Sequence, residues 1–306
     1  MNLREWALPV YTILMQLASG AMLFLWVVRS INFKHNSKEE IEEMSSNPVF
    51  VILLTIGVAM AGSHFHLSKP YFSFLAMLNV NSSWLSREIV LTVLFFFSVG
   101  ILSFLQTDKS KGYRLNTTLG WLSIGLGLAN VYCMSVVYLL PTQEAWDTPF
   151  TIISFYGSTL LLGISALAAL LVLDLKFVEI REPLKLINRT PIIQRALSWF
   201  SVVAVAMAGL IIITNFYQIS LLYHGSEPAK TSLQLLLEIY WVLLAMRFVL
   251  LFAGVGWLAI SAYLLRKERK TVNELVIPVY VSCLLVLIGE ILGRFLFYAS
   301  HVRLGM

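Results

Sequence analysis

Eight apolar stretches, each long enough to cross a lipid bilayer, dominate this chain of 306 residues. An α-helix rises 1.5 Å per residue, so about 20 apolar residues cover the roughly 30 Å hydrocarbon core of a membrane. The stretches lie at about 7–28, 48–68, 86–105, 115–140, 149–173, 196–223, 236–265 and 276–300. No linker or clear internal repeat separates them. We therefore predict an all-α integral membrane protein, a bundle of eight transmembrane helices that forms a single domain over 1–306.

The composition excludes a water-soluble fold. Only 13% of the residues are charged and 58% are hydrophobic, whereas a soluble domain carries about 25% charged residues. The formal net charge of +5 does not indicate nucleic acid, because the basic residues lie in loops between the apolar stretches rather than on one soluble face. The partner that the composition indicates is the lipid bilayer.

The distribution of basic residues predicts the orientation. Of the 22 Lys and Arg residues, fifteen lie in the first, third, fifth and seventh loops, and five in the tails and remaining loops. Cytoplasmic loops carry the excess of Lys and Arg. We therefore expect the odd-numbered loops in the cytoplasm and both termini on the outer, periplasmic side.

Two ionisable groups lie at the predicted outer ends of neighbouring spans. His66 is near the end of the stretch at 48–68, and Glu88 is near the start of the stretch at 86–105. A charge in hydrocarbon costs at least a few kcal/mol, so each such group needs a partner, a water-filled cavity or a ligand. The alternatives without a functional role are that His66 simply lies at the membrane interface and that Glu88 caps its helix.

The last predicted span adds a polar stripe. Glu290, Arg294 and Tyr298 are spaced by four residues and share one helical face in the outer half of the membrane. Glu290 and Arg294 can neutralise one another, and a purely structural ion pair is the alternative to a functional site. The polar residues thus converge on one leaflet.

Other polar and small residues extend this pattern. Arg247 lies deep in the stretch at 236–265 and requires an internal acidic or carbonyl partner, while the remaining charges avoid the inner half of the membrane. Gln16 and Gln218 add polar groups in their spans, and a GxxxG at 289–293 would let another helix approach closely.

The sequence predicts no metal centre. A b-type haem between helices needs two inward histidines at matching depth on different helices. Of the five histidines, two lie in predicted loops, one is close to the C-terminus and two share one segment. Cys133 and Cys283 lack the CxxC spacing of zinc or iron–sulfur sites. We expect neither haem nor an iron–sulfur cluster in this chain.

Three segments carry a resemblance to a known family: His66-Leu67-Ser68-Lys69-Pro70, then Ser86-Arg87-Glu88-Ile89 after Asn79, and Gly289-Glu290-Ile291-Leu292-Gly293-Arg294-Phe295-Leu296-Phe297-Tyr298. With Arg247 and the eight spans, they make the chain resemble the dimethyl sulfoxide reductase membrane anchor subunit (DmsC) over nearly its whole length. The resemblance implies a heterotrimer in the bacterial inner membrane. In it, the anchor holds an iron–sulfur subunit and a molybdopterin catalytic subunit on the outer face and supplies them with electrons from menaquinol in anaerobic respiration.

The resemblance also implies site residues. The family's quinol site corresponds to His66 and Glu88, with Glu290, Arg294 and Tyr298 as the matching set in the last span. The anchor is itself non-catalytic apart from this quinol-oxidising site, and the family carries no haem.

Two positions depart from the family pattern. Ser68 stands where a glycine is expected, which reshapes the turn. Val136, ahead of Tyr138, stands where relatives carry an arginine, which leaves open how a phosphate, a carboxylate or the partner subunit is held there.

Chemistry and charge placement favour quinol oxidation over its rivals. A quinol needs a lipid-open crevice with proton acceptors at its polar end, and a histidine can accept a proton near neutral pH. A small-solute or ion transporter would need polar groups through both leaflets. An anchor of a related polysulfide or selenate reductase stays open, because substrate choice lies in the catalytic subunit.

Overall fold

The computed structural model describes residues 3–33, 37–64, 70–107, 112–267 and 273–302. Within these ranges there are helices and no strand, and eight of the helices are long and apolar enough to span a membrane. The prediction of an all-α membrane protein with eight spans is confirmed. The helices are α1 (Leu3–Asn32), α2 (Lys38–His64), η1 (Pro70–Asn79), α3 (Trp84–Thr107), α4 (Tyr113–Val136), α5 (Pro149–Arg181), η2 (Pro183–Lys185), α6 (Leu186–His224), α7 (Glu227–Gln234), η3 (Leu235–Ile239), α8 (Trp241–Arg266), η4 (Asn273–Leu275) and α9 (Val276–Ala299).

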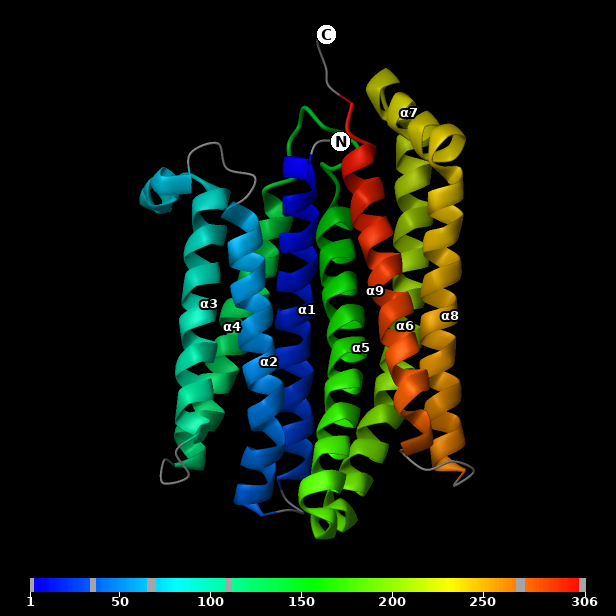
Figure 1. Cartoon of the computed structure of the whole chain (residues 1–306). Coiled ribbons are helices and arrows are strands. Elements are labelled where there is room, and N and C mark those ends of the chain that lie inside the picture. Colours follow the sequence, from blue (N-terminus) through cyan, green and yellow to red (C-terminus); the bar gives the residue numbers. More distant parts are fainter. Residues whose placement is uncertain (1–2, 34–36, 65–69, 108–111, 268–272, 303–306) are drawn as a thin grey trace.

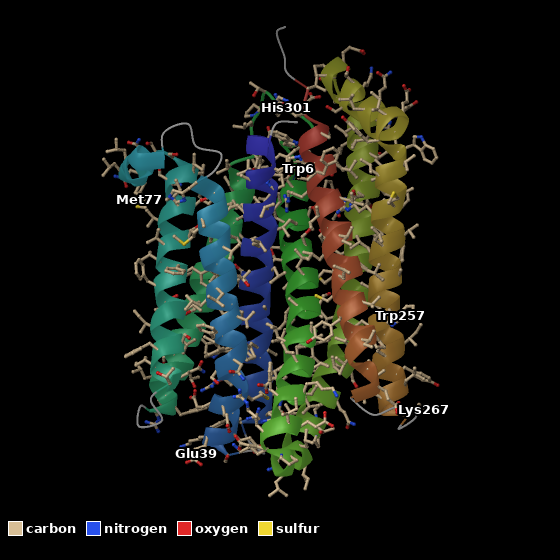
Figure 2. All side chains as sticks on the ribbon, viewed as in Figure 1. Trp6, Glu39, Met77, Trp257, Lys267 and His301 are labelled. Atoms are coloured by element: carbon tan, nitrogen blue, oxygen red, sulfur yellow. The ribbon has the colours of Figure 1, made fainter. Side chains whose placement is uncertain are left out.

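The spans run up and down, and the bundle has two distinct ends. α1 begins and α9 ends at the same end of the bundle, where η1 and α7 also lie (Figure 1). Figure 2 places Trp6 and His301 at this end, and Glu39 and Lys267 at the other. We call these the terminal end and the opposite end.

The spans α1 and α5 form the centre of the bundle. In the most apolar part of each span, 72% of the α1 residues and 78% of the α5 residues are buried inside the bundle. The corresponding share in the other six spans is 33–50%. In hydrocarbon the backbone must satisfy its own hydrogen bonds, so helices meet through side-chain packing and close backbone contact. Gly20 and Gly163 allow that contact, because a Cβ at either glycine would overlap the backbone of the other helix. The remaining spans pack around this pair.

Three helix ends differ from the sequence prediction. α2 begins at Lys38 rather than near 48, α5 continues to Arg181 rather than ending near 173, and α6 begins at Leu186 rather than near 196. Two predicted loops at the opposite end, at about 29–47 and 174–195, are therefore largely helical in their described residues. The helices continue because their charged side chains pair with one another instead of facing lipid.

These pairs form a buried ionic network at the opposite end. Arg29 is fully buried, forms an ion pair with Glu42 and donates a hydrogen bond to Ser45 Oγ at 2.9 Å. Arg189 pairs with Asp174 at 2.8 Å, with both side chains 2% exposed. The sequence analysis expected charges other than Arg247 to avoid the inner half of the membrane; the structure buries these charged pairs at the opposite end of the bundle, and Arg247 lies near the start of α8, toward the terminal end. The sequence pattern placed Arg29 and Arg189 in loops because it reveals the charges but not the partners that neutralise them.

Replacing Asp174 with asparagine should destabilise the bundle. Asp174 also accepts a hydrogen bond from Asn47 Nδ2 at 2.9 Å, and its loss leaves the buried Arg189 with the more distant Glu43 at 3.3 Å. Removing one partner of a buried ion pair costs about 3–5 kcal/mol. In detergent, the thermal unfolding temperature of Asp174→Asn should be clearly lower than that of the wild-type chain. The exposed Lys230–Glu227 pair provides the control, and an equal fall for Lys230→Gln would contradict this account of the network.

Candidate functional site

The structure places four of the five predicted site residues, all in the half of the bundle near the terminal end. Glu88 lies on α3, and Glu290, Arg294 and Tyr298 lie on α9. His66 lies outside the described residues, in the segment between α2 and η1.

Glu88 lies inside α3 rather than at its cap. The helix begins at Trp84, and Glu88, only 5% exposed, faces inward more than one turn further along. Its carboxyl group interacts with the Tyr11 hydroxyl, which lies 2.8 Å from Thr92 Oγ1. The effect of a carboxylate on the helix dipole is confined to the first turn. The structure therefore favours a buried polar contact with α1 over simple capping.

The hydrogen bonds continue from Glu88 into α4. Thr92 Oγ1 lies 2.9 Å from the Glu88 backbone oxygen and 3.2 Å from Asn130 Oδ1. A hydroxyl has one proton to donate, so it serves these two acceptors alternately. Asn130 Nδ2 is buried without a hydrogen-bond partner in the described part of the chain. This group of side chains therefore has unused donor capacity next to Glu88.

Tyr298 pairs with a tyrosine that the sequence analysis did not select. Its hydroxyl lies 2.6 Å from the hydroxyl of Tyr138, which follows the end of α4. Trp146, Phe155 and Phe297 surround the Tyr138 ring at centroid distances of 5.2–5.7 Å. Both tyrosines also interact electrostatically with Glu88. The only sequence signal for Tyr138 was its position two residues after Val136, the departure from the family pattern.

Glu290 and Arg294 do not form the expected ion pair. In the described structure, Glu290 Oε2 accepts a hydrogen bond from Ser158 Oγ at 2.6 Å, whereas Arg294 Nη2 donates to Gln16 Oε1 at 2.8 Å. The Arg294 guanidinium also lies 3.8 Å from the centre of the Phe155 ring, a cation–π contact. The residues share a helix face, but their side chains extend toward different neighbouring helices. Their charges therefore interact at longer range.

Arg247 has the carbonyl partner that its depth requires. Its Nη1 donates to the side-chain oxygen of Asn215 on α6 at 3.2 Å. A Cβ added to Gly293 would lie 2.5 Å from Arg247 Nε, and one added to Gly289 would lie 2.9 Å from Leu251. The GxxxG of α9 thus admits α8, and Gly293 makes the space in which the guanidinium lies.

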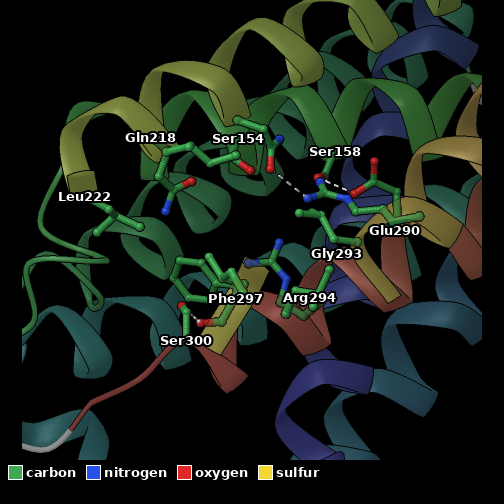
Figure 3. Close-up of a pocket in the computed structure, with 15 residues that line it drawn as sticks. Ser154, Ser158, Gln218, Leu222, Glu290, Gly293, Arg294, Phe297 and Ser300 are labelled. Carbon is green, nitrogen blue, oxygen red and sulfur yellow. Dashed lines mark hydrogen bonds between the residues drawn. The ribbon is translucent and has the colours of Figure 1, made fainter. Parts of the chain in front are cut away.

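A pocket opens beside these charges (Figure 3). Its cavity has a volume of about 50 Å³, or about 650 Å³ when the open space at its mouth is counted. The helices α5, α6, η3, α8 and α9 contribute to its walls. The polar side chains that line it are Ser154, Ser158, Asn215, Gln218, Arg247, Glu290, Arg294 and Ser300. Glu88 and Tyr298 do not line it.

These groups lie near one another toward the terminal end, and we call them the polar layer. It consists of Glu88 and of separate hydrogen-bonded pairs on helices from α1 to α9: Tyr11 with Thr92, Tyr138 with Tyr298, Arg294 with Gln16, Glu290 with Ser158 and Arg247 with Asn215. Sequence analysis missed Tyr11, Asn130 and Ser158, because single hydroxyl and amide groups are common in membrane spans. The side chains of this layer can donate and accept hydrogen bonds. No group of three or more His, Cys, Asp or Glu side chains suited to a metal ion occurs among the described residues.

The eight spans and the buried polar layer define a multi-span membrane protein with polar side chains inside its bundle. The chain belongs to the DMSO reductase anchor subunit (DmsC) family, whose sequence model matches residues 1–300. An anchor subunit of this family works with catalytic and electron-transfer partner subunits. The resemblance given by the motifs is confirmed.

Three curated relatives, each named as an anaerobic dimethyl sulfoxide reductase chain, match over nearly the whole length. The YnfH protein of Escherichia coli K12 is 30% identical over 99% of this chain and 96% of its own length. The relative from Haemophilus influenzae is 27% identical, with 100% and 98% covered. A second relative from Escherichia coli K12 is 26% identical, with 99% and 96% covered.

Proposed function

We propose that this chain anchors a molybdoenzyme complex of the dimethyl sulfoxide reductase type in the bacterial inner membrane and carries its menaquinol-oxidising site. An iron–sulfur subunit and a molybdopterin catalytic subunit complete the heterotrimer. Electrons would pass from the quinol directly to the iron–sulfur partner, since the sequence predicts neither haem nor a cluster in this chain. The proposal treats residues 1–306 as one domain. The three relatives support it, since each is named as a dimethyl sulfoxide reductase chain.

The proposal assigns the terminal end to the periplasm. The loops with the excess of Lys and Arg connect the spans at the opposite end, which corresponds to the cytoplasm. The polar layer then lies in the outer half of the membrane. The partner subunits dock above it at the terminal end.

The burial of Glu88 beside Tyr11, shortly after the segment that contains His66, is the observation that carries the proposal. A quinol that loses two electrons to become a quinone must also release two protons, and it approaches from the lipid. His66 accepts one hydroxyl proton as a hydrogen-bonded base, and Glu88 passes protons to the periplasmic side.

The α9 residues act on the same site from the other side of α1. Arg294 and Glu290 set the local electrostatic field through their contacts with Gln16 and Ser158. Tyr298 and Tyr138 share a hydrogen bond between their hydroxyl groups and interact electrostatically with both Glu88 and Arg294. In this arrangement the set orients the quinol and stabilises charge as its protons leave.

Replacing His66 with asparagine tests the assignment of the base. Asparagine can donate and accept hydrogen bonds but cannot take up a proton near neutral pH, so turnover driven by menaquinol should fall by roughly two orders of magnitude. Turnover driven by a reduced dye that donates directly to the partner subunits should be unchanged. If menaquinol-driven turnover persists at the wild-type rate, His66 is not the base.

Two alternatives are less favoured. An ion or solute path would need polar groups through the membrane, yet neither central helix carries a charge between its two ends: α1 has none from Trp6 to Val28, and α5 none from Pro149 to Leu173. The buried ionic network and the polar layer are therefore separated along these helices. An anchor for a polysulfide or selenate reductase would share this site and differ in its catalytic partner.

A further inference from the structure

The pocket at the α8 side of the polar layer carries more buried positive charge than negative. Arg247, Arg294 and Glu290 line it and are 6%, 5% and 2% exposed. Glu290 acts electrostatically on both guanidinium groups and is the one acidic residue among the described residues that line the pocket. With two cations against one carboxylate, the walls hold an excess of one positive charge.

The arginines have donors to spare. A guanidinium has five N–H donors. Among hydrogen bonds between described residues, Arg247 donates one, to Asn215, and Arg294 donates one, to Gln16. Arg247 Nε and Arg294 Nε are buried without a partner. The Phe155 ring stabilises Arg294 but cannot neutralise it.

Other donors converge on the same space. The Ser154 hydroxyl and the Gln218 amide line the pocket, and Gln218 keeps one amide proton free because the other is donated to Ala145 O. Figure 3 shows Gln218 and Arg294 on its walls. Apolar residues of α6, η3 and α8 complete the lining: Ile219, Leu222, Leu236 and Leu244. An unpaired charge at this depth costs several kcal/mol, which a bound anion would offset.

We propose that this pocket binds an anionic, oxygen-bearing group of the phosphate type, held by Arg247 and Arg294 through charge-assisted hydrogen bonds. Either a dissolved anion or the headgroup of an anionic phospholipid offers this chemistry. The site shares Arg294 and Glu290 with the residues proposed to orient the quinol, but Glu88 does not line it. Its occupancy does not depend on turnover.

Thermal unfolding of the full-length chain in lipid nanodiscs tests the proposal. A ligand that binds only the folded state raises the unfolding temperature with its concentration. In phosphatidylcholine nanodiscs at constant ionic strength, stabilisation by added inorganic phosphate identifies a dissolved anion. Stabilisation by phosphatidylglycerol without added phosphate identifies the lipid. The proposal is overturned if the wild-type chain responds to neither.

Two pocket variants and a control test whether the stabilisation by the anion arises at this pocket. Arg247→Gln should raise the anion concentration needed for half-maximal stabilisation at least tenfold. Asn215→Asp places a carboxylate of nearly the same shape beside Arg247, so it should stabilise the anion-free chain and remove the response. Arg87→Gln should behave as wild type, because Arg87 donates to the Val80 and Asn81 backbone oxygens outside the pocket.

The variants also decide the outcome if one of them is unstable. Should Arg247→Gln not fold, Asn215→Asp alone carries the test. A wild-type response in either pocket variant overturns the proposal. A third result also overturns the proposal: a neutral naphthoquinone stabilises the chain in an Arg247-dependent way, and neither anion does. The quinol site would then extend into this pocket.

Discussion

Replacing Glu88 with glutamine is expected to lower menaquinol-driven turnover of the complex by about two to four orders of magnitude. Glutamine keeps the size and the hydrogen-bonding geometry beside Tyr11 but cannot carry a proton, and a positioned acid or base contributes about 10²–10⁴-fold to a rate. The measurement is turnover with a menaquinol analogue in membranes that contain the assembled complex. Dye-driven turnover in the same membranes reports whether the partner subunits remain bound and active.

Glu144 provides the matched control for Glu88. It lies at the terminal end, is exposed, and accepts hydrogen bonds from the Ser226 backbone nitrogen and hydroxyl at 3.1 and 2.7 Å. Glu144→Gln should therefore leave both activities at wild-type levels. Equal losses in the two variants would mean that acidic residues at this end support docking of the partners rather than proton transfer.

Replacing Gly163 with leucine is expected to prevent formation of the bundle. The Cβ alone would overlap the Gly20 backbone, and a leucine side chain would force α1 and α5 apart. Backbone atoms cannot move aside as a flexible side chain can, so the cost exceeds the few kcal/mol of ordinary overpacking. Size-exclusion chromatography of the detergent-extracted chain should show aggregate or no extractable protein.

Gly125 provides the control for this substitution. It lies on α4, and nothing lies within 4 Å of a Cβ built there. Gly125→Leu adds the same side chain in the lipid-facing environment and should give a monodisperse chain at wild-type yield. Recovery of a stable, monodisperse Gly163→Leu chain would contradict the close contact of α1 and α5.

Hydropathy was sufficient to predict the spans but not all of their ends. The cost of placing backbone and charge in hydrocarbon determines where a span must be apolar, and this is visible in one sequence. Whether a charged segment continues as helix depends on partners from other helices. Arg29 with Glu42, and Arg189 with Asp174, extend the helices at the opposite end beyond their apolar parts.

The part of the candidate site that lies on a single helix, α9, was predictable from the sequence. Spacing placed Glu290, Arg294 and Tyr298 on one face of α9, and their depth matched that of Glu88. Their contacts come from α1, α5 and the turn after α4, so spacing within α9 suggested an ion pair that does not form. The depth of Arg247 required an internal acidic or carbonyl partner, and only packing identifies this partner as the Asn215 side-chain carbonyl.

Photoaffinity labelling with a photoactivatable menaquinone analogue tests the central claim most directly, because it reports where the quinol binds in the assembled complex. The account predicts that labelled peptides come from the terminal end, from α1 around Tyr11, from α3 around Glu88 and from the segment with His66, and that excess menaquinone suppresses them. Labelling that concentrates at the opposite end, in the pocket lined by Glu39, Glu42 and Asn116, would contradict it.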